Sequence, residues 1–210
     1  WNPVVAEWWG DTATYSECNT KINGNTNAGS QGTIAVSSGE WWVEFQLARG
    51  SDTVQVGLLA VEGYNGGNDN TLRFNWNSST RNITKDGSHV QTGLPLPSDG
   101  DWMSFYFDAD GNSVQFYHWN GSSWDTYGTS ESLTNAPGDN YHYAFLGFVA
   151  GTGDYIKLNT GITALKGSLP VAASSAKFWN TANLPAPSIS KPSDQFLPIL
   201  YEGNGGGQRV

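Results

Sequence analysis

The sequence has little cysteine, little positive charge and no long apolar run. Cys18 is the one cysteine among 210 residues, so the chain cannot close an internal disulfide or build a thiolate metal cluster. Lys and Arg number 10 against 19 Asp and Glu, and the formal net charge is −9. An acidic chain repels polyanions, so we predict no nucleic-acid partner. No apolar stretch approaches the ~20 residues of a membrane-spanning helix, so we also predict no membrane insertion.

Targeting segments are also missing. The sequence has no basic stretch followed by an apolar one, which is the pattern of a signal peptide. Because the chain begins at Trp1 rather than Met, we expect a processed or excised piece of a longer protein.

The residues that are abundant favour β-structure. Aromatic residues make up 13% of the chain, charged residues only 14%, and 26 glycines lie among many Asn, Ser and Thr. Runs of Ala, Glu, Lys and Leu, which are typical of helices, are absent. An all-β chain of 210 residues usually forms one domain. We therefore predict a single all-β domain, an antiparallel β-sandwich.

The clearest structural signal is a hairpin in residues 101–121, DWMSFYFDADGNSVQFYHWNG. Apolar and polar residues alternate on both sides of Asp108–Asn112, where Gly and Asn tolerate positive φ and Asp can bond the local backbone. The alternation predicts a set of core-facing residues: Met103, Phe105, Phe107, Val114 and Phe116. The opposite face carries Trp102, Tyr106, Tyr117 and, at the strand end, Trp119.

Further strands are predicted at the spacing of a sandwich. They are residues 12–16, 32–37, 40–48, 53–62, 71–76, 141–150 and 154–158, with residues 19–31 as turn and loop. In residues 40–48 the odd positions form an apolar face, whereas Trp42 stands among the polar residues of the other face. We predict sequential antiparallel pairing as the simplest topology.

The character of the chain changes after Gly161. Prolines at 170, 185, 187, 192 and 198 would interrupt any ladder of strand hydrogen bonds. We therefore divide the chain into a sandwich, residues 1–167, and an extended proline-rich connector toward a following module, residues 168–210. Within the connector, Phe178, Trp179 and Leu184 are candidates to lie on the sandwich.

Several short segments resemble a known family. They are GEWWVEF at 39–45, VQVG at 54–57, GDW at 100–102, FYFD at 105–108 and NSVQFY at 112–117. Their order resembles the SPRY branch of concanavalin A-like sandwiches over residues 39–160, and the hairpin is the most specific part. The resemblance implies a concanavalin A-like or SPRY-like jelly roll.

A second resemblance lies downstream, in FWNTANLPAPSISKPS at 178–193 and LYEGNG at 200–205. These segments are similar to the connector that follows SPRY-like modules in bacteriophage and prophage virion proteins, usually tail fibres. The sequence departs from it at Asn180, where the connector often has Cys. The resemblance implies a component of the virion surface with a recognition module, and it supplies no ligand.

Aromatic side chains on the outer face of the hairpin are the first candidates for a binding site. Sugar binding needs flat rings that stack on the C–H side of a pyranose, and amide or carboxylate groups that bond its hydroxyls. The candidates are Trp42, Trp102, Tyr106, Tyr117 and Trp119. The alternative is that the proline-rich segment or a neighbouring subunit covers these rings, since large apolar residues outside the main core usually mark a buried contact.

Two loops combine aromatic rings with amide or carboxylate groups, and loops at the ends of a sandwich commonly carry function. Residues 63–70 contribute Tyr64, Asn68 and Asp69, and residues 119–127 contribute Trp119, Asn120, Trp124 and Tyr127. The alternative is a flexible turn for the first loop and a plain hairpin turn at Asn120–Gly121 for the second.

No metal, cofactor or catalytic residue is predicted. Asp108–Asn112 begins like a calcium loop, but Trp119 stands at the twelfth position, where an EF-hand has a carboxylate. His89, His118 and His142 are too scattered in the sequence to indicate a metal site.

The predicted function is a non-catalytic attachment module of a phage virion that binds a host-surface glycan or another virion protein. One alternative is a purely structural decoration domain of a capsid or fibre. Another is a polysaccharide-degrading glycosidase in which Glu44 acts with an unidentified partner, since Glu40 lies ~13 Å away by strand rise and a retaining pair needs ~5.5 Å. Homo-oligomerisation within the virion stays open.

Overall fold

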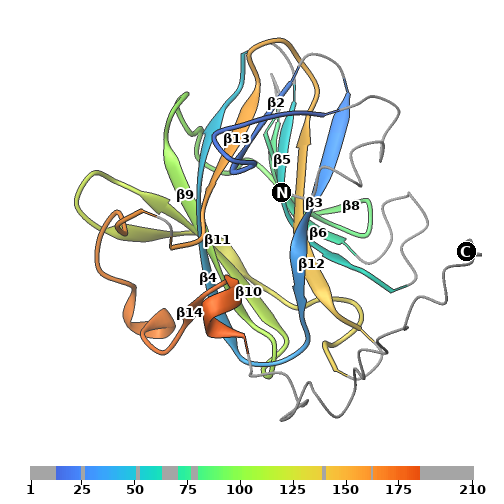
Figure 1. The fold of residues 1–210 in the computed structure, drawn as a ribbon, viewed down its shortest axis with the longest axis vertical. Helices are drawn as coiled ribbons and strands as arrows, with labels where there is room; N and C mark the ends of the chain where they lie inside the picture. The colour runs from blue at the N-terminus through green and yellow to red at the C-terminus, as the bar shows by residue number, and fades with distance from the viewer. Residues whose placement is uncertain are drawn as a thin grey trace, which may run out of the picture.

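The computed structural model describes residues 13–24, 27–50, 53–62, 71–76, 80–138, 141–161 and 163–184. In these ranges the chain forms two β-sheets that pack face to face and no α-helix (Figure 1). The predicted all-β sandwich is confirmed. None of the helical turns in the described ranges has the length and hydropathy to span a membrane.

The larger sheet is antiparallel except at one short strand. Its spatial order is β1 (Thr14–Ser16), β2 (Lys21–Asn23), β13 (Tyr155–Asn159), β4 (Glu40–Ala48), β9 (Trp102–Asp108), β10 (Ser113–Trp119) and β11 (Trp124–Glu131). Strand β13 pairs with β4 only from Glu44 to Ala48, and β14 (Lys177–Phe178) pairs in parallel with Trp41 and Trp42. Because β9 occupies the other edge of β4, β14 takes the edge that β13 leaves free.

The smaller sheet is wholly antiparallel. Its order is β3 (Ala28–Val36), β12 (Tyr143–Val149), β5 (Val54–Ala60), β6 (Thr71–Trp76), β7 (Arg81–Lys85) and β8 (Ser88–Gln91). Strands β5 to β8 follow one another in sequence and in space, as do β9 to β11.

The predicted sequential pairing is right for those two meanders and for the β1–β2 pair, and it is wrong elsewhere. Strand β4 pairs with β9 and β13, and β3 pairs with β12. Five strands, β2, β7, β8, β11 and β14, were not predicted, and β2 and the start of β3 lie within residues 19–31, which were expected to be loop. Alternation identifies the face of a residue but not its partner strand, and these strands carry few buried apolar residues.

The inner faces of both sheets form the main core. The five predicted core residues of the hairpin are all at most 1% exposed: Met103, Phe105, Phe107, Val114 and Phe116. The odd-numbered residues of β4 face the same core. The alternation patterns predicted for the hairpin and for residues 40–48 are therefore both confirmed. The turn between β9 and β10 forms as predicted, because the Gly111 amide donates to Asp108 Oδ1 at 2.8 Å and Asn112 adopts a φ of +50°.

Residues 163–184, which we call the C-terminal strap, lie against the sandwich. They include two short 3₁₀ turns, η2 (Val171–Ala173) and η3 (Thr181–Asn183), and strand β14. Phe178 packs on the outer face of the larger sheet, whereas Trp179 is fully buried in the main core and Leu184 packs against its margin. All three candidate residues of the connector therefore contact the sandwich. The boundary at residue 167 stays a prediction.

Candidate functional site

The outer face of the larger sheet carries a second aromatic cluster. Trp42 is fully buried in it, and its ring centroid lies 5.3 Å from that of Tyr117 and 5.4 Å from that of Trp124. Ala173 of the C-terminal strap completes the buried part. We call these four residues the outer cluster. Trp42 and Tyr117 thus contact this domain's own side chains, as in the alternative in which the proline-rich segment covers them, and Trp124 packs beside them.

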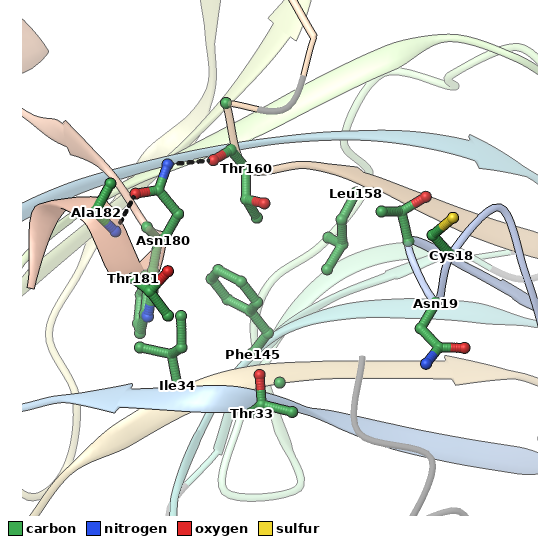
Figure 2. A pocket seen from close by; sticks show the side chains of 14 residues that line it. Cys18, Asn19, Thr33, Ile34, Phe145, Leu158, Thr160, Asn180, Thr181 and Ala182 are labelled. Carbon is green, nitrogen blue, oxygen red and sulfur yellow. Dashed lines mark hydrogen bonds between the residues drawn. The ribbon is translucent and has the colours of Figure 1, made fainter.

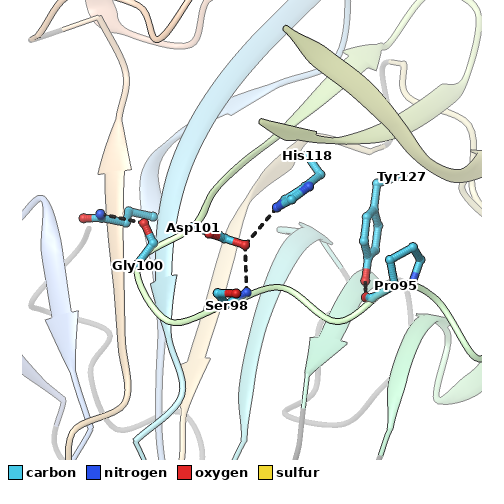
Figure 3. Close-up of polar contacts among 7 residues, drawn as sticks. Pro95, Ser98, Gly100, Asp101, His118 and Tyr127 are labelled. Atoms are coloured by element: carbon cyan, nitrogen blue, oxygen red, sulfur yellow. Dashed lines mark hydrogen bonds and ion pairs between the residues drawn. The ribbon is translucent and has the colours of Figure 1, made fainter. Parts of the chain in front are cut away.

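Tyr106 and Tyr127 lie in different environments. Tyr106 is partly buried beside the outer cluster, and burial together with the Glu40 carboxylate raises the pKa of its hydroxyl. Tyr127 belongs to the main core, and its hydroxyl donates to the Pro95 carbonyl at 2.6 Å (Figure 3). Burial raises the pKa of Tyr127 as well. The structure therefore does not bring Tyr127 to the outer face.

Three other predicted site residues come together at the end of the β9–β10 hairpin that lies away from its turn. They are Trp102, Trp119 and Asn120. They line a pocket of about 350 Å³ whose walls are Gly100, Asp101, Trp102, His118, Trp119, Asn120 and Gly121. We call it the tryptophan pocket. Both indole rings are partly exposed, unlike the rings of the outer cluster.

Asp101 and His118 form the polar part of the tryptophan pocket (Figure 3). His118 Nε2 lies 2.9 Å from Asp101 Oδ2, which also accepts a hydrogen bond from the Ser98 amide at 2.7 Å. Among the described residues, no group bonds Asp101 Oδ1, so this oxygen can accept a hydrogen bond from a ligand hydroxyl. Sequence reasoning missed both residues, although the hairpin register, which pairs His118 with Met103, brings them to one edge.

Asn120 supports the pocket as a turn residue. Its Oδ1 accepts from the amides of Ser122 and Ser123 at 2.9 Å, and its Nδ2 donates to Asp125 at 2.9 Å. Gly121 follows with a φ of +100°, a conformation that glycine adopts without strain. The predicted turn at Asn120–Gly121 therefore forms the lip of the pocket.

The C-terminal strap bounds the tryptophan pocket on one side. Lys166 Nζ lies 4.5 Å from the centroid of a Trp102 ring. A Cβ on Gly167 would come within 2.5 Å of Trp119, so only glycine allows this close approach. The two indole rings are thus held between the hairpin and the strap.

The carboxyl considered for hydrolysis does not face the pocket. Glu44 is fully buried and accepts hydrogen bonds from Asn159 Nδ2 at 2.9 Å and from the Lys166 amide at 3.3 Å. Burial raises the pKa of Glu44, although these two hydrogen bonds oppose the shift. Glu40 accepts a hydrogen bond from the Ser175 hydroxyl. Of the described residues that line the tryptophan pocket, Asp101 alone carries a carboxyl.

Tyr64, Asn68 and Asp69 lie outside the described residues. The described part of the chain holds no group of three His, Cys, Asp or Glu side chains arranged for a metal ion.

A larger pocket, of about 500 Å³, opens between the sheets (Figure 2). Its floor includes Phe145 and Trp179, and its rim includes Thr33, Thr160 and Asn180. Asn180 Nδ2 donates to the Thr160 carbonyl at 2.7 Å, which fixes the strap at this rim. No predicted site residue lines it.

Comparison with solved structures identifies the class of fold as that of SPRY domains. The SPRY domain of human HERC1 matches with a TM-score of 0.56 and 13% identity, covering 78% of this chain and 99% of that one. The TRIM65 PSpry domain matches with a TM-score of 0.53 and 12% identity, covering 70% and 85%. No family model and no curated protein matches the sequence. The chain therefore has a SPRY-like fold, and the SPRY part of the sequence resemblance is confirmed.

Proposed function

We propose that this domain is a non-catalytic recognition module of a phage virion, and that the tryptophan pocket receives a sugar unit of a host-surface glycan. The observation that carries the proposal is the meeting in one pocket of Trp102 and Trp119 with Asp101, whose Oδ1 accepts no hydrogen bond from a described residue. Indole rings supply a flat apolar surface for the C–H side of a sugar, and a carboxylate oxygen accepts its hydroxyls.

The absence of a second carboxyl at the pocket supports binding over hydrolysis. Glycosidases use two carboxyl groups that flank the bond to be cleaved. The described lining of the tryptophan pocket offers Asp101, and Glu44 is sealed beneath the strap. The enzyme alternative thus lacks a carboxyl pair at this site.

A protein partner fits the same face less well. Specific protein interfaces bury roughly 800 Å² on each partner around a buried aromatic centre. Here the aromatic centre, Trp42 with Tyr117 and Trp124, is already covered by the strap. What stays open is a small pocket, which suits one sugar unit better than a broad surface. Binding to another virion protein, or a structural decoration role, remains the alternative outcome of the test.

The test is a glycan array probed with the wild type and with Trp119→Ala and Asp101→Ala. We expect binding to a subset of glycans and a loss of about 10-fold or more in either variant, because ~1.4 kcal/mol corresponds to a tenfold change in affinity. Val171→Ala serves as the control, since Val171 is 93% exposed on the strap. If the wild type binds none of the sugars, the glycan proposal is contradicted and the structural role is left.

The virion assignment rests on the connector sequence at residues 178–205 and is tested separately. We expect tail or capsid genes beside the parent gene. A neighbourhood without them would contradict the virion context without affecting the pocket.

A further inference from the structure

A row of outward-facing residues crosses the larger sheet beside the tryptophan pocket. Lys157 pairs with Gln46, and Gln46 pairs with Trp102 on the next strand. Because His118 pairs with Met103, Trp119 lies across from Trp102. Residues that pair across adjacent strands share one face, so the row runs from β13 to β10 over three strand spacings, ~14 Å.

Trp102 lies between Gln46 and Trp119 in this row and lines two hollows. One is the tryptophan pocket, and the other has a volume of about 320 Å³. Its lining is Glu17, Cys18, Thr20, Trp102, Lys157, Leu158, Asn159 and Thr163. We call it the lysine pocket. Since one side chain forms a wall of both, the two pockets adjoin across Trp102, and we call the pair of pockets the groove.

The C-terminal strap contacts this row only in part, so that Gln46, Trp102, Trp119 and Lys157 all stay partly exposed, and the neighbouring row is fully buried. Glu44 and Ser104, which pair one step further along β4 and β9, are both fully buried. Thr163 lines the lysine pocket and Gly167 packs against Trp119. The strap is therefore one bank of the groove. The opposite bank is formed by the loop at Gly100 and Asp101.

The charged groups of the groove balance one another. Lys157 Nζ lies 2.6 Å from Glu17 Oε2, and this contact lowers the pKa of the Glu17 carboxyl. Asp101 is paired with His118, and Lys166 stands over Trp102. With two lysines against two carboxylates, the groove has no net positive charge to attract an anion. The chain as a whole carries −9, which repels acidic polymers.

We propose that the groove binds two or more consecutive units of a neutral glycan chain that crosses the strands, with one unit in the tryptophan pocket and the next in the lysine pocket. Trp102 contacts both units. This inference rests on the proposed function, because it extends the same site. It assigns Thr163 and the Lys157–Glu17 pair to the second unit.

The test uses the glycan that binds on the array, prepared as its mono-, di- and trisaccharide, with affinities measured by calorimetry. For the wild type we expect the dissociation constant to fall about 10-fold or more between the first and the longer members. In Thr163→Trp, a bulky side chain fills the lysine pocket. This variant should bind the monosaccharide as the wild type does and gain nothing from added units. Val171→Trp, on the exposed part of the strap, should keep the full length dependence.

Each outcome decides the inference separately from the proposed function. Equal affinity for all lengths, or a length dependence that Thr163→Trp retains, overturns the extended groove and leaves the single-unit pocket. Tighter binding of an acidic analogue than of the neutral chain overturns the assigned ligand class. If the wild type binds no glycan on the array, both proposals are overturned.

Discussion

Phe178 and Trp179 are neighbours in the chain but pack on opposite faces of the larger sheet. Phe178 contacts the outer cluster, whereas Trp179 lies in the main core, its ring stacked on Phe107 at 5.7 Å and 4.5 Å from Phe145. The alternation of a β-strand produces this division, because β14 fills the edge of β4 that β13 leaves free. Strand β14 and the residue that follows it thus connect the strap to both apolar layers.

Trp179→Ala should destabilise the whole domain. The substitution removes a fully buried indole and leaves a cavity among Trp41, Phe107 and Phe145. Large-to-small changes of this kind cost ~3–5 kcal/mol. Urea unfolding followed by circular dichroism measures the loss, with Val171→Ala as the surface control. A loss below ~1 kcal/mol would mean that the strap is not part of the folded core.

Ala173→Glu should release residues 165–176 of the strap from the outer face, while Trp179 keeps its place in the main core and the sandwich stays folded. Ala173 is fully buried against the outer cluster, and an unpaired carboxylate there is strongly unfavourable. We expect Trp42 to become exposed to solvent and the tryptophan emission to shift to longer wavelength. Faster proteolysis within residues 165–176 should accompany the shift. An unchanged spectrum and cleavage pattern would contradict the covering role of Ala173.

The Glu44 carboxyl should make a pH-dependent contribution to the free energy of unfolding, and Glu44→Gln should remove that contribution. Burial raises the folded-state pKa of Glu44, so the folded protein binds more protons than the unfolded chain once the pH passes the unfolded value of ~4.3. The stability of the wild type relative to Glu44→Gln should therefore fall as the pH rises from that value through the raised pKa. Unfolding free energies of both proteins between pH 4 and 8 give the difference directly. A difference that grows with pH would show that the carboxylate is stabilised in place.

Gly57→Ala should prevent normal pairing of two strands. A Cβ at Gly57 would lie 2.0 Å from the Leu72 carbonyl oxygen, which belongs to the backbone of β6 and cannot move aside. Soluble yield and thermal midpoint should both drop sharply. Gly93→Ala is the matched control, because its Cβ meets nothing within 4 Å and only its φ of +66° is unfavourable. Equal soluble yields and thermal midpoints for the two variants would contradict the close approach of Gly57 to the Leu72 carbonyl. The clash also explains why glycine suits the VQVG segment.

The faces of the strands could be predicted from the sequence, but their partners could not. Alternation in residues 101–121 placed Phe105 and Phe116 in the core correctly. The alternation in residues 40–48 placed Trp42 on an outward face, where Tyr117, Trp124 and, over a hundred residues later, Ala173 bury it. No local pattern encodes that contact, which depends on the edge of β4 being open to β14.

The sequence could indicate the residues of the proposed site only in part, for the same reason. Trp102, Trp119 and Asn120 lie on one hairpin, so their meeting follows from a local register. The lysine pocket joins Glu17, Trp102 and Lys157 from three distant segments. Their proximity depends on the pairing of β13 with β4 and of β4 with β9, which was not predicted.

The most direct test of the central claim is to follow the indole N–H signals of the tryptophans by NMR while the glycan selected on the array is added. The account predicts saturable shifts at Trp102 and Trp119, with the buried Trp42, Trp124 and Trp179 nearly unchanged. Shifts confined to other tryptophans, or no shift at Trp102 and Trp119 at saturating sugar, would contradict it.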